Sequence, residues 1–272
     1  MKTIVVKIGG EVTATPEMDA IARDVKALVE DGHRVSMVHG GGPQATALQK
    51  ALGLQTRMVA GRRYTDPETL EVMKYAVAGK VNVDVCARLL ANGVLGVGLH
   101  GASGHAVVAR KRPPRVMAGA GPEPVDLGLV GDVVGFNLPL FGDLWARGYV
   151  PVVACLGCDD AGQPLNINGD TVASQLAGAL RADALVLVTS APGVLRDVKD
   201  PGSRVPRITH ADFEKGVADG SISGGMIPKL EESFEVLKDG ARSVVIVGHL
   251  APGDLRRAVE EPGSVGTVLV ES

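Results

Sequence analysis

The stretch Val35-Ser-Met-Val-His-Gly-Gly-Gly-Pro-Gln44 decides how this chain is expected to fold. Residues 34–38 predict a short buried strand, and residues 44–54 have the apolar spacing of a helix. A strand that passes through three glycines into a helix leaves backbone N–H groups without partners and without a Cβ to block a ligand. These groups and the positive end of the helix favour an anion such as a phosphate or a carboxylate. A tight strand–helix turn without a ligand accounts for the same residues, so the rest of the chain must decide.

The composition indicates the fold class. With 272 residues, the chain is long enough for one large or two modest domains. Apolar residues make up 45% of the sequence and aromatic residues only 3%, while glycine occurs 36 times. We therefore expect a core of Val, Leu, Ala and Ile, which is typical of an α/β protein whose sheet is flanked by helices.

Charge and hydropathy argue against several classes of function. The formal net charge is −3 and the longest basic run is Arg110-Lys-Arg112, which argues against nucleic acid as a partner. No window of about 18 apolar residues could span a membrane, and we find no signal peptide, so we expect a cytoplasmic protein. Cys155 and Cys158 form a lone C-x-x-C, for which an apolar strand end is favoured over a metal or redox site.

Two lysines stand next to glycine-rich segments. Residues 3–8 predict the first strand, which closes with Lys7-Ile-Gly-Gly10. Because lysine is rarely buried without a partner, Lys7 either reaches water from the strand end or is a cation beside a loop that approaches a phosphate. Gly220-Ser-Ile-Ser-Gly-Gly-Met-Ile-Pro-Lys229 is a second glycine-rich helix entry, with a lysine in the first helical turn. Exposed helix lysines are usually solvated, so Lys229 alone decides nothing.

Two further segments place polar side chains before predicted helices. In Gly61-Arg-Arg-Tyr-Thr-Asp-Pro67, a guanidinium group could grip a carboxylate through two parallel hydrogen bonds. Both arginines could instead be surface charges, an interpretation that suits Arg62 better than Arg63. In Asn166-Ile-Asn-Gly-Asp170, the polar side chains would share one face of an extended segment and supply two neutral donors and one acid. Asp170 could instead cap the helix predicted over residues 172–181.

The segment Gly96-Val-Gly-Leu-His-Gly101 matches the G-x-G-x-x-G pattern of dinucleotide-binding proteins. That fingerprint requires a helix directly after the glycines and an acidic residue about 20 positions later. Residues 102–104 instead predict a turn and residues 105–111 a strand. We therefore interpret the match as accidental and reject an NAD-dependent dehydrogenase.

The order of these segments resembles the amino-acid kinase family and, within it, the N-acetyl-L-glutamate kinases. Six blocks occur in the family's order, between about residues 3 and 270: Val6-Lys-Ile-Gly-Gly10, Val38-His-Gly-Gly-Gly-Pro43, Arg63-Tyr-Thr-Asp66, Asn166-Ile-Asn-Gly-Asp170, Pro192-Gly193 and Gly224-Gly-Met-Ile-Pro-Lys229. The resemblance implies an open, mostly parallel sheet sandwiched between helices. Residues 1–180 would form a lobe that binds the acyl acceptor and dimerises, and residues 181–272 a lobe that binds ATP.

The resemblance also implies a reaction and a role for each matching residue. The γ-phosphoryl group of ATP, which carries Mg²⁺, would move to the side-chain carboxylate of N-acetyl-L-glutamate, the second step of arginine synthesis. The implied catalytic residues are Lys7, Lys229 and Asp170, which would hold both lysines. The acceptor would be bound by Gly41, Gly42, Arg63, Asn166 and Asn168. ATP would be bound by Gly9, Gly10, Thr189, Ser190, Gly193, Leu195, Gly225 and Met226, and no dedicated protein site for a metal is implied.

Some positions depart from the family pattern. Many relatives carry Asp in place of Ser190, often Lys in place of Val83, and Ser in place of His100. None of these changes removes a residue assigned to charge stabilisation, although the change at Ser190 puts the detail of nucleotide binding in doubt. Relatives that arginine inhibits carry an extra N-terminal helix that assembles rings of dimers. This sequence starts a few residues before its first strand, so we expect a homodimer that free arginine does not inhibit.

Related activities on the same fold are the main alternatives. A kinase for aminoadipate on a small acidic carrier protein, from lysine synthesis, tends to lack the complete blocks at residues 39–43 and 224–229. Carbamate and uridylate kinases fit the blocks at residues 63–66 and 166–170 less well. A non-catalytic nucleotide or amino-acid sensor would have no use for two lysines and an aspartate suited to charge stabilisation.

Overall fold

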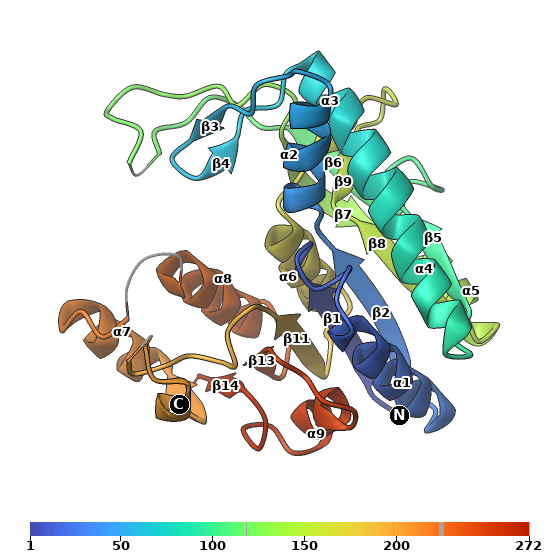
Figure 1. The fold of residues 1–272 in the computed structure, drawn as a ribbon, viewed down its shortest axis with the longest axis vertical. Helices are drawn as coiled ribbons and strands as arrows, with labels where there is room; N and C mark the ends of the chain where they lie inside the picture. The colour runs from blue at the N-terminus through green and yellow to red at the C-terminus, as the bar shows by residue number, and fades with distance from the viewer. Residues whose placement is uncertain (118, 198, 223–225, 272) are drawn as a thin grey trace.

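An eight-stranded sheet forms the centre of the molecule in the computed structural model, which describes residues 1–117, 119–197, 199–222 and 226–271 (Figure 1). Its strands, in spatial order, are β12 (Arg207–Thr209), β14 (Thr267–Val270), β13 (Val244–Val247), β11 (Ala184–Val188), β1 (Thr3–Ile8), β2 (Arg34–His39), β8 (Val150–Ala154) and β5 (Gly96–Leu99). Neighbouring strands run parallel, except that β13 and β14 are antiparallel. The predicted open, mostly parallel sheet is therefore confirmed.

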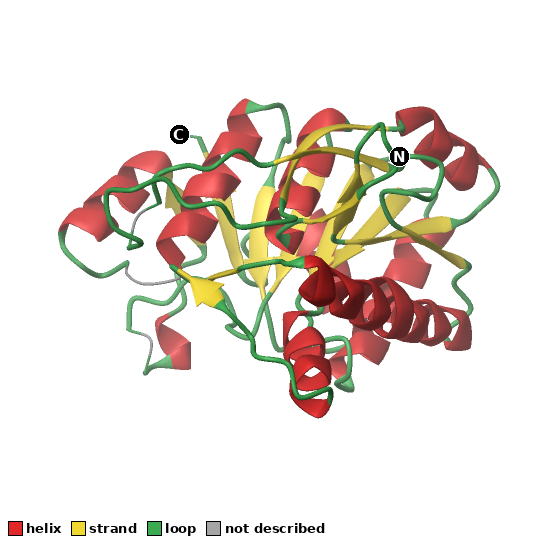
Figure 2. Ribbon diagram, turned by 90° about the horizontal axis from the view of Figure 1, so that it is seen from above, coloured by secondary structure: helices red, strands yellow, loops and turns green. Residues whose placement is uncertain are grey.

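Helices cover both faces of this sheet (Figure 2). One buried cluster joins Ile4, Val6 and Ile8 to side chains of α1 (Glu17–Glu30), α4 (Asn82–Ala91) and α9 (Asp254–Glu260). A second cluster joins Val5 and strand β11 to α5 (Leu138–Ala146), α6 (Gly169–Ala179) and α8 (Met226–Lys238). Both faces are apolar because parallel strands covered by helices need continuous hydrophobic runs such as ALVLV in β11.

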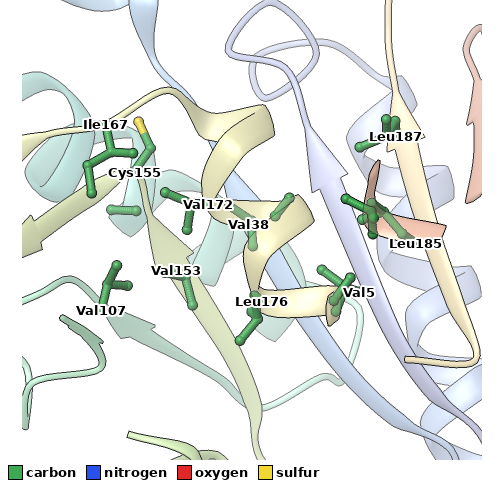
Figure 3. Packing of buried hydrophobic residues seen from close by; sticks show 14 of the residues in the cluster. Val5, Val38, Val107, Val153, Cys155, Ile167, Val172, Leu176, Leu185 and Leu187 are labelled. Atoms are coloured by element: carbon green, nitrogen blue, oxygen red, sulfur yellow. The ribbon is translucent and has the colours of Figure 1, made fainter. Parts of the chain in front are cut away.

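The alternation of side chains along β1 decides where Lys7 points. Successive strand residues face opposite sides, so Lys7 shares a face with Val5 rather than with Val6. Val5 packs on the α6 face, where Figure 3 shows it near Leu176 of that helix. Lys7 is consequently directed from the end of β1 towards the start of α6, and its side chain is largely buried.

A second layer of strands flanks the large sheet near α6. It has the order β10 (Pro164–Asn166), β9 (Leu156–Cys158), β6 (Val107–Lys111) and β7 (Gly131–Phe136). A separate hairpin of β3 (Met58–Val59) and β4 (Arg62–Arg63) lies beside the long connection before β7 (Figure 1). Met117, Leu127 and Val130 of that connection pack against Val59 of the hairpin. These contacts fix the hairpin to the connection before β7.

Residues 67–91 form one long helical run. It consists of α3 (Pro67–Met73), the π-helical segment η1 (Lys74–Val81) and α4. Asp66 caps its start, because the carboxylate accepts a hydrogen bond from the Thr69 N–H at 2.8 Å. A π-helical turn inside an α-helix rotates the residues that follow it and often occurs at functional sites.

Other element boundaries and elements differ from the sequence-based expectations. Helix α2 (Gly42–Ala51) begins two residues before the predicted start, and α6 begins three residues before its predicted start. The short helix η2 (Pro201–Ser203), α7 (His210–Ala218), α9, β9 and β12 were not predicted.

Cys155 and Cys158 are buried at the β8–β9 segment with free thiols, as an apolar strand end requires. None of the described helices is long and apolar enough to cross a membrane.

Candidate active site

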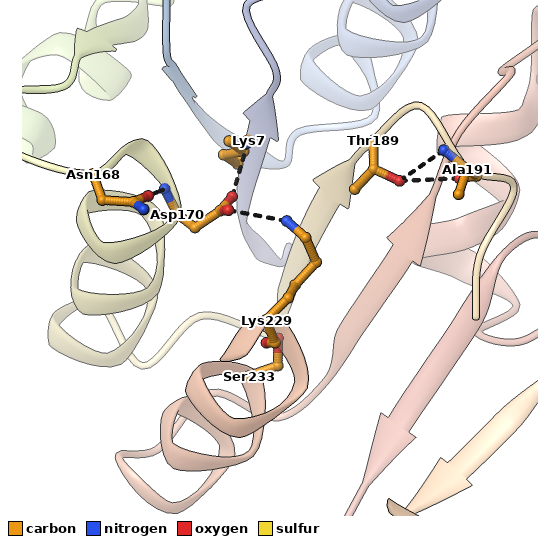
Figure 4. A network of polar contacts seen from close by, with 7 residues as sticks. All are labelled: Lys7, Asn168, Asp170, Thr189, Ala191, Lys229 and Ser233. Carbon is orange, nitrogen blue, oxygen red and sulfur yellow. Dashed lines mark hydrogen bonds and ion pairs between the residues drawn. The ribbon is translucent and has the colours of Figure 1, made fainter. Parts of the chain in front are cut away.

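Asp170 lies between the two lysines that the sequence places next to glycine-rich segments. Its Oδ1 is 2.8 Å from the Nζ of Lys7, and its Oδ2 accepts a hydrogen bond of 2.9 Å from the Nζ of Lys229 (Figure 4). Lys7 comes from β1, Asp170 from the first turn of α6, and Lys229 from the first turn of α8. Three segments far apart in the chain therefore form one charged centre.

The capping of α6 leaves both oxygens of Asp170 available to the lysines. Asn168, not Asp170, is the N-cap residue, and its side chain accepts a hydrogen bond of 2.7 Å from the Asp170 N–H. The alternative in which Asp170 caps the helix is therefore wrong. The Lys7 contact is an ion pair without hydrogen-bond geometry, since Oδ1 accepts no hydrogen bond from the described residues.

The electrostatics of this centre favour an anionic ligand. Burial raises the pKa of Asp170, but the charges of Lys7 and Lys229 and their contacts outweigh burial and bring the pKa below its usual value. The carboxylate is therefore ionised near neutral pH. Two ammonium groups and one carboxylate leave one excess positive charge in a partly buried site, where it attracts an anion more strongly than in water.

Three glycine-containing turns meet beside Lys7. A Cβ on Gly10 would lie 3.0 Å from the Cα of Gly41, and a Cβ on Gly169 would lie 3.5 Å from the N of Gly40 and 3.7 Å from the Cε of Lys7. Gly41 is the N-cap residue of α2 and Gly42 is its first helical residue, so their N–H groups have no partner within the helix. The structure thus supplies unpaired backbone donors near the charged centre.

Gln44 ties two of these turns together, a role that was not predicted. Its Nε2 donates to the carbonyl of Gly10 at 2.6 Å, and the Thr13 hydroxyl donates to the same carbonyl at 2.9 Å. In the sequence, Gln44 looks like an ordinary polar residue of a first helical turn. Only the contact between residues 34 positions apart reveals that it fixes the loop after β1 against the start of α2.

Arg63 lies against the start of α2. Its Nη2 donates to the Gly42 carbonyl at 3.1 Å and to the Thr46 hydroxyl at 2.8 Å, while Nη1 donates to the buried Gln49 side chain. Burial lowers the pKa of Arg63, although a guanidinium group remains charged throughout the physiological range. The arginine is therefore held next to Gly42 by contacts that were not predicted from the sequence.

Asn166, at the end of β10, lies beside Thr65, two residues after Arg63. Its Nδ2 donates to the Thr65 hydroxyl at 3.0 Å, and both groups are buried. Asn168, two residues later, is exposed and is engaged as the cap of α6. The two asparagines thus differ in environment, and their predicted role in acceptor binding stays a prediction.

The residues predicted to bind ATP lie around the ends of β1 and β11. These strands are adjacent and parallel, with Ile8 opposite Val188, so Gly9 and Gly10 emerge at the same sheet edge as Thr189 and Ser190. The Thr189 hydroxyl donates to the Ala191 carbonyl at 3.0 Å (Figure 4). Gly193 and Leu195 follow in the next loop and Met226 begins α8, whereas Gly225 lies outside the described residues.

A groove of about 700 Å³ opens at this edge beside Ser190. Glu11, Arg23 and His249 contribute polar groups to its wall, and apolar side chains line most of the remainder. The carboxylate of Glu11 lies so close to Gly9 that a Cβ on Gly9 would overlap it. Because this carboxylate is the end of a flexible, exposed side chain, it could move aside, so the contact does not by itself require a glycine at position 9.

Glu232 is a further acidic residue next to the charged centre, and no pattern in the sequence singles it out. It lies one turn after Lys229 on α8. Burial raises the pKa of Glu232, an effect that a hydrogen bond with the Thr171 side chain partly offsets and the nearby charge of Asp170 reinforces. The site therefore contains a second carboxyl group that is harder to ionise than an ordinary glutamate.

A mostly parallel α/β sheet that brings a Lys–Asp–Lys centre and glycine turns to one edge suits an enzyme of the kinase type. The chain belongs to the amino acid kinase family, whose family model matches residues 2–248. An acetylglutamate kinase from Anaeromyxobacter sp. (strain K) is 79% identical over 270 residues, which cover 99% of both chains. An acetylglutamate kinase from Sorangium cellulosum (strain So ce56) is 56% identical and covers 98% of this chain and 94% of its own.

Solved structures of distant sequence share the fold. N-acetylglutamate synthase from Neisseria gonorrhoeae, in complex with coenzyme A and N-acetyl-glutamate, superimposes with a TM-score of 0.81 at 22% identity, over 100% of this chain and 60% of that chain. Carbamate kinase from Giardia lamblia bound to AMP-PNP has a TM-score of 0.66 at 17% identity and covers 100% of this chain and 99% of its own. At these identities the likeness concerns the fold alone.

Proposed function

We propose that this chain uses ATP to phosphorylate the side-chain carboxylate of N-acetyl-L-glutamate, which yields N-acetyl-L-glutamyl 5-phosphate in the second step of arginine biosynthesis. Relatives with 56–79% identity over nearly the full chain carry the name acetylglutamate kinase. The structural observation that carries the proposal is the Asp170 carboxylate between the Nζ atoms of Lys7 and Lys229.

This centre suits phosphoryl transfer, which needs positioning and charge stabilisation rather than covalent help from the protein. The acceptor carboxylate is already ionised at neutral pH, so no general base is needed to activate it. Two anions must instead approach each other. Lys7 and Lys229 neutralise the transferred group from two sides, and Asp170 holds their ammonium groups at a fixed spacing.

The glycine turns and Arg63 orient the acceptor. The N–H groups of Gly41 and Gly42 donate to the acceptor, and Arg63, which is fixed against Gly42 and Thr46, binds its α-carboxylate with help from Asn166. Holding the reacting oxygen in line with the phosphoryl group removes much of the entropic cost of bringing two molecules together. In this proposal residues 1–180 bind the acceptor.

Residues 181–272 bind ATP, in this proposal at the edge formed by β1 and β11. Mg²⁺ enters with ATP as part of the substrate and supplies charge neutralisation on the phosphate oxygens. Asp170 is a poor metal ligand, because two lysines already engage its oxygens. Gly9 and Gly10 face the phosphates from the loop after β1, and the residues after β11 line the nucleotide.

The substrate assignment is tested by trapping the acyl phosphate. The protein is supplied with MgATP and hydroxylamine together with N-acetylglutamate, glutamate, aspartate or aminoadipate, and the hydroxamate is measured. We expect turnover with N-acetylglutamate and none with the other three acids. Preference for aminoadipate would reassign the substrate, and no turnover with any acid would favour a non-catalytic sensor.

We also propose that the enzyme is a cytoplasmic homodimer. Strand β5 lies at one edge of the large sheet, α4 exposes Val83 and Leu90, and the connection between α4 and β5 exposes Leu95. Exposed apolar side chains beside an unpaired strand edge are typical of a subunit interface. The three thiols are free, which suits a reducing compartment. Sedimentation of a monomer at micromolar concentration would refute the dimer, and inhibition by millimolar arginine would contradict the expected lack of arginine control.

A further inference from the structure

His39 lies directly before the Gly40–Gly42 turn, and no step of the proposed reaction uses its side chain. The residue ends strand β2 and is completely buried. Its Nδ1 is 2.8 Å from the carbonyl oxygen of Gly40, and its Nε2 is 2.8 Å from the Nδ2 of Asn82. The same Nδ2 donates to the carbonyl of Val152 at 3.0 Å. A buried polar chain therefore runs from β8 through α4 to the turn.

The two backbone carbonyls at the ends of this chain fix its hydrogen positions. A carbonyl only accepts, so Asn82 must present its NH₂ group to Val152 and His39 must carry its proton on Nδ1. The Nε2 of His39 then has a free lone pair, which accepts from Asn82. Burial lowers the pKa of His39 to about 4, in keeping with a neutral ring in this arrangement. One set of protons thereby satisfies the two carbonyls, the Asn82 NH₂ group and both nitrogens of the His39 ring.

Asn82 reaches His39 because a neighbouring residue is glycine. A Cβ on Gly98 of β5 would overlap the Oδ1 of Asn82. The π-helical segment η1 ends at Val81, so the residue after it enters the space between β2, β5 and β8. The G-x-G-x-x-G match thus has a structural explanation, since no helix follows β5 directly and Gly98 makes room for an asparagine.

We propose that His39 is a positioning residue for the acyl acceptor, and that Asn82 acts through it by fixing the orientation of its ring. The C=O of Gly40 and the N–H of Gly41 belong to one planar trans peptide and point in opposite directions. Because His39 holds the Gly40 carbonyl on the buried side, the Gly41 N–H is aimed away from the core. Glycines have no intrinsic preference for one such geometry, so an external anchor is required. The inference rests on the proposed function.

Two substitutions of His39 separate its contacts. His39→Asn places a donor near the position of Nδ1 and retains the contact with the Gly40 carbonyl. His39→Gln reaches towards Asn82 and loses the contact with the Gly40 carbonyl. We expect His39→Gln to raise the KM for N-acetylglutamate about tenfold or more, with the KM for ATP nearly unchanged, and His39→Asn to stay closer to wild type. Equal lowering of Tm in both variants without a change in either KM would overturn the proposal.

A substitution on another strand tests the same unit without altering His39. Gly98→Ala displaces Asn82, while Gly96→Ala on the same strand places its Cβ 3.0 Å from the flexible end of Leu89 and serves as the matched control. We expect the acceptor KM to rise in Gly98→Ala only. An unchanged acceptor KM in Gly98→Ala and His39→Gln, with an active wild type, would refute the positioning role. A wild type without turnover of N-acetylglutamate would instead overturn the proposed function and this inference with it.

Discussion

Acidification should destabilise the fold through His39, and the structure sets the size of the effect. Burial lowers the pKa of this ring from 6.5 to about 4 and outweighs the hydrogen bond with Gly40, which raises the pKa. Between these values the unfolded chain binds a proton that the folded chain does not, so stability rises with pH in this window. The contribution is fully present above about pH 6.5 and is lost as the pH falls towards 4. At about 1.4 kcal/mol per pH unit, it amounts to about 3 kcal/mol.

The assay compares urea unfolding of wild type and His39→Asn between pH 4.5 and pH 7.5. The variant lacks the ring, so its free energy of unfolding loses this pH-dependent term while the carboxylates common to both proteins cancel in the difference. We expect the stability advantage of wild type over the variant to be about 2–3 kcal/mol smaller at pH 4.5 than at pH 7.5, with equal dependence on urea.

Nitrogen chemical shifts of ¹⁵N-labelled histidine provide an independent measurement of the same ring. They should report the Nδ1–H tautomer of His39 down to about pH 5, with the His39→Asn spectrum identifying the signal. A constant stability difference across the pH range would refute the reasoning. So would a ring that titrates near 6.5 in the folded protein, because a protonated Nε2 would then face the NH₂ group of Asn82 without cost.

Three further predictions concern the site and the fold. Lys229→Ala should lower kcat about 10²-fold or more with little change in the acceptor KM, as steady-state kinetics can measure; a loss confined to KM would mean that its role is binding. Arg63→Ala should mainly raise the acceptor KM, and an unchanged value would remove Arg63 from the pocket. Asp24→Ala should reduce the unfolding free energy by about 1–3 kcal/mol with kcat retained, because its carboxylate accepts hydrogen bonds from the N–H groups of Gly253 and Leu255 at the start of α9. Unchanged urea stability of Asp24→Ala would show that α9 needs no such anchor.

The large sheet was well predicted because the residue pattern of each strand shows whether its two faces are buried. Strands such as β11 and β13 are buried on both faces and therefore read as unbroken apolar runs. Short elements carried weaker signals. Thr209 and Asp212 form a capping box at the start of α7, and this pattern could have been recognised in the sequence. Helix α9 has seven residues and relies on Asp24, more than 200 positions away, so no local pattern predicts it.

The candidate site was predictable only in part, for a similar reason. The position of Lys7 near the end of a buried strand and shortly before two glycines raised the question of its partner, but local chemistry could not identify Asp170. That partner came from the family resemblance. Gln44 and Gln49 could not be selected at all, because a polar residue on a short helix is ordinarily solvated. Their importance depends on the Gly10 carbonyl and the Arg63 guanidinium group, which approach only when separate segments pack together.

The shared carboxylate of Asp170 resolves a conflict between folding and catalysis. Two ammonium groups brought together in a partly buried site repel each other, and each one alone would favour a return to water. A carboxylate between them offsets that repulsion, and its place in the first turn of α6 adds the favourable field of the helix. The centre can therefore be stable without a ligand and still present one excess positive charge to a migrating phosphoryl group.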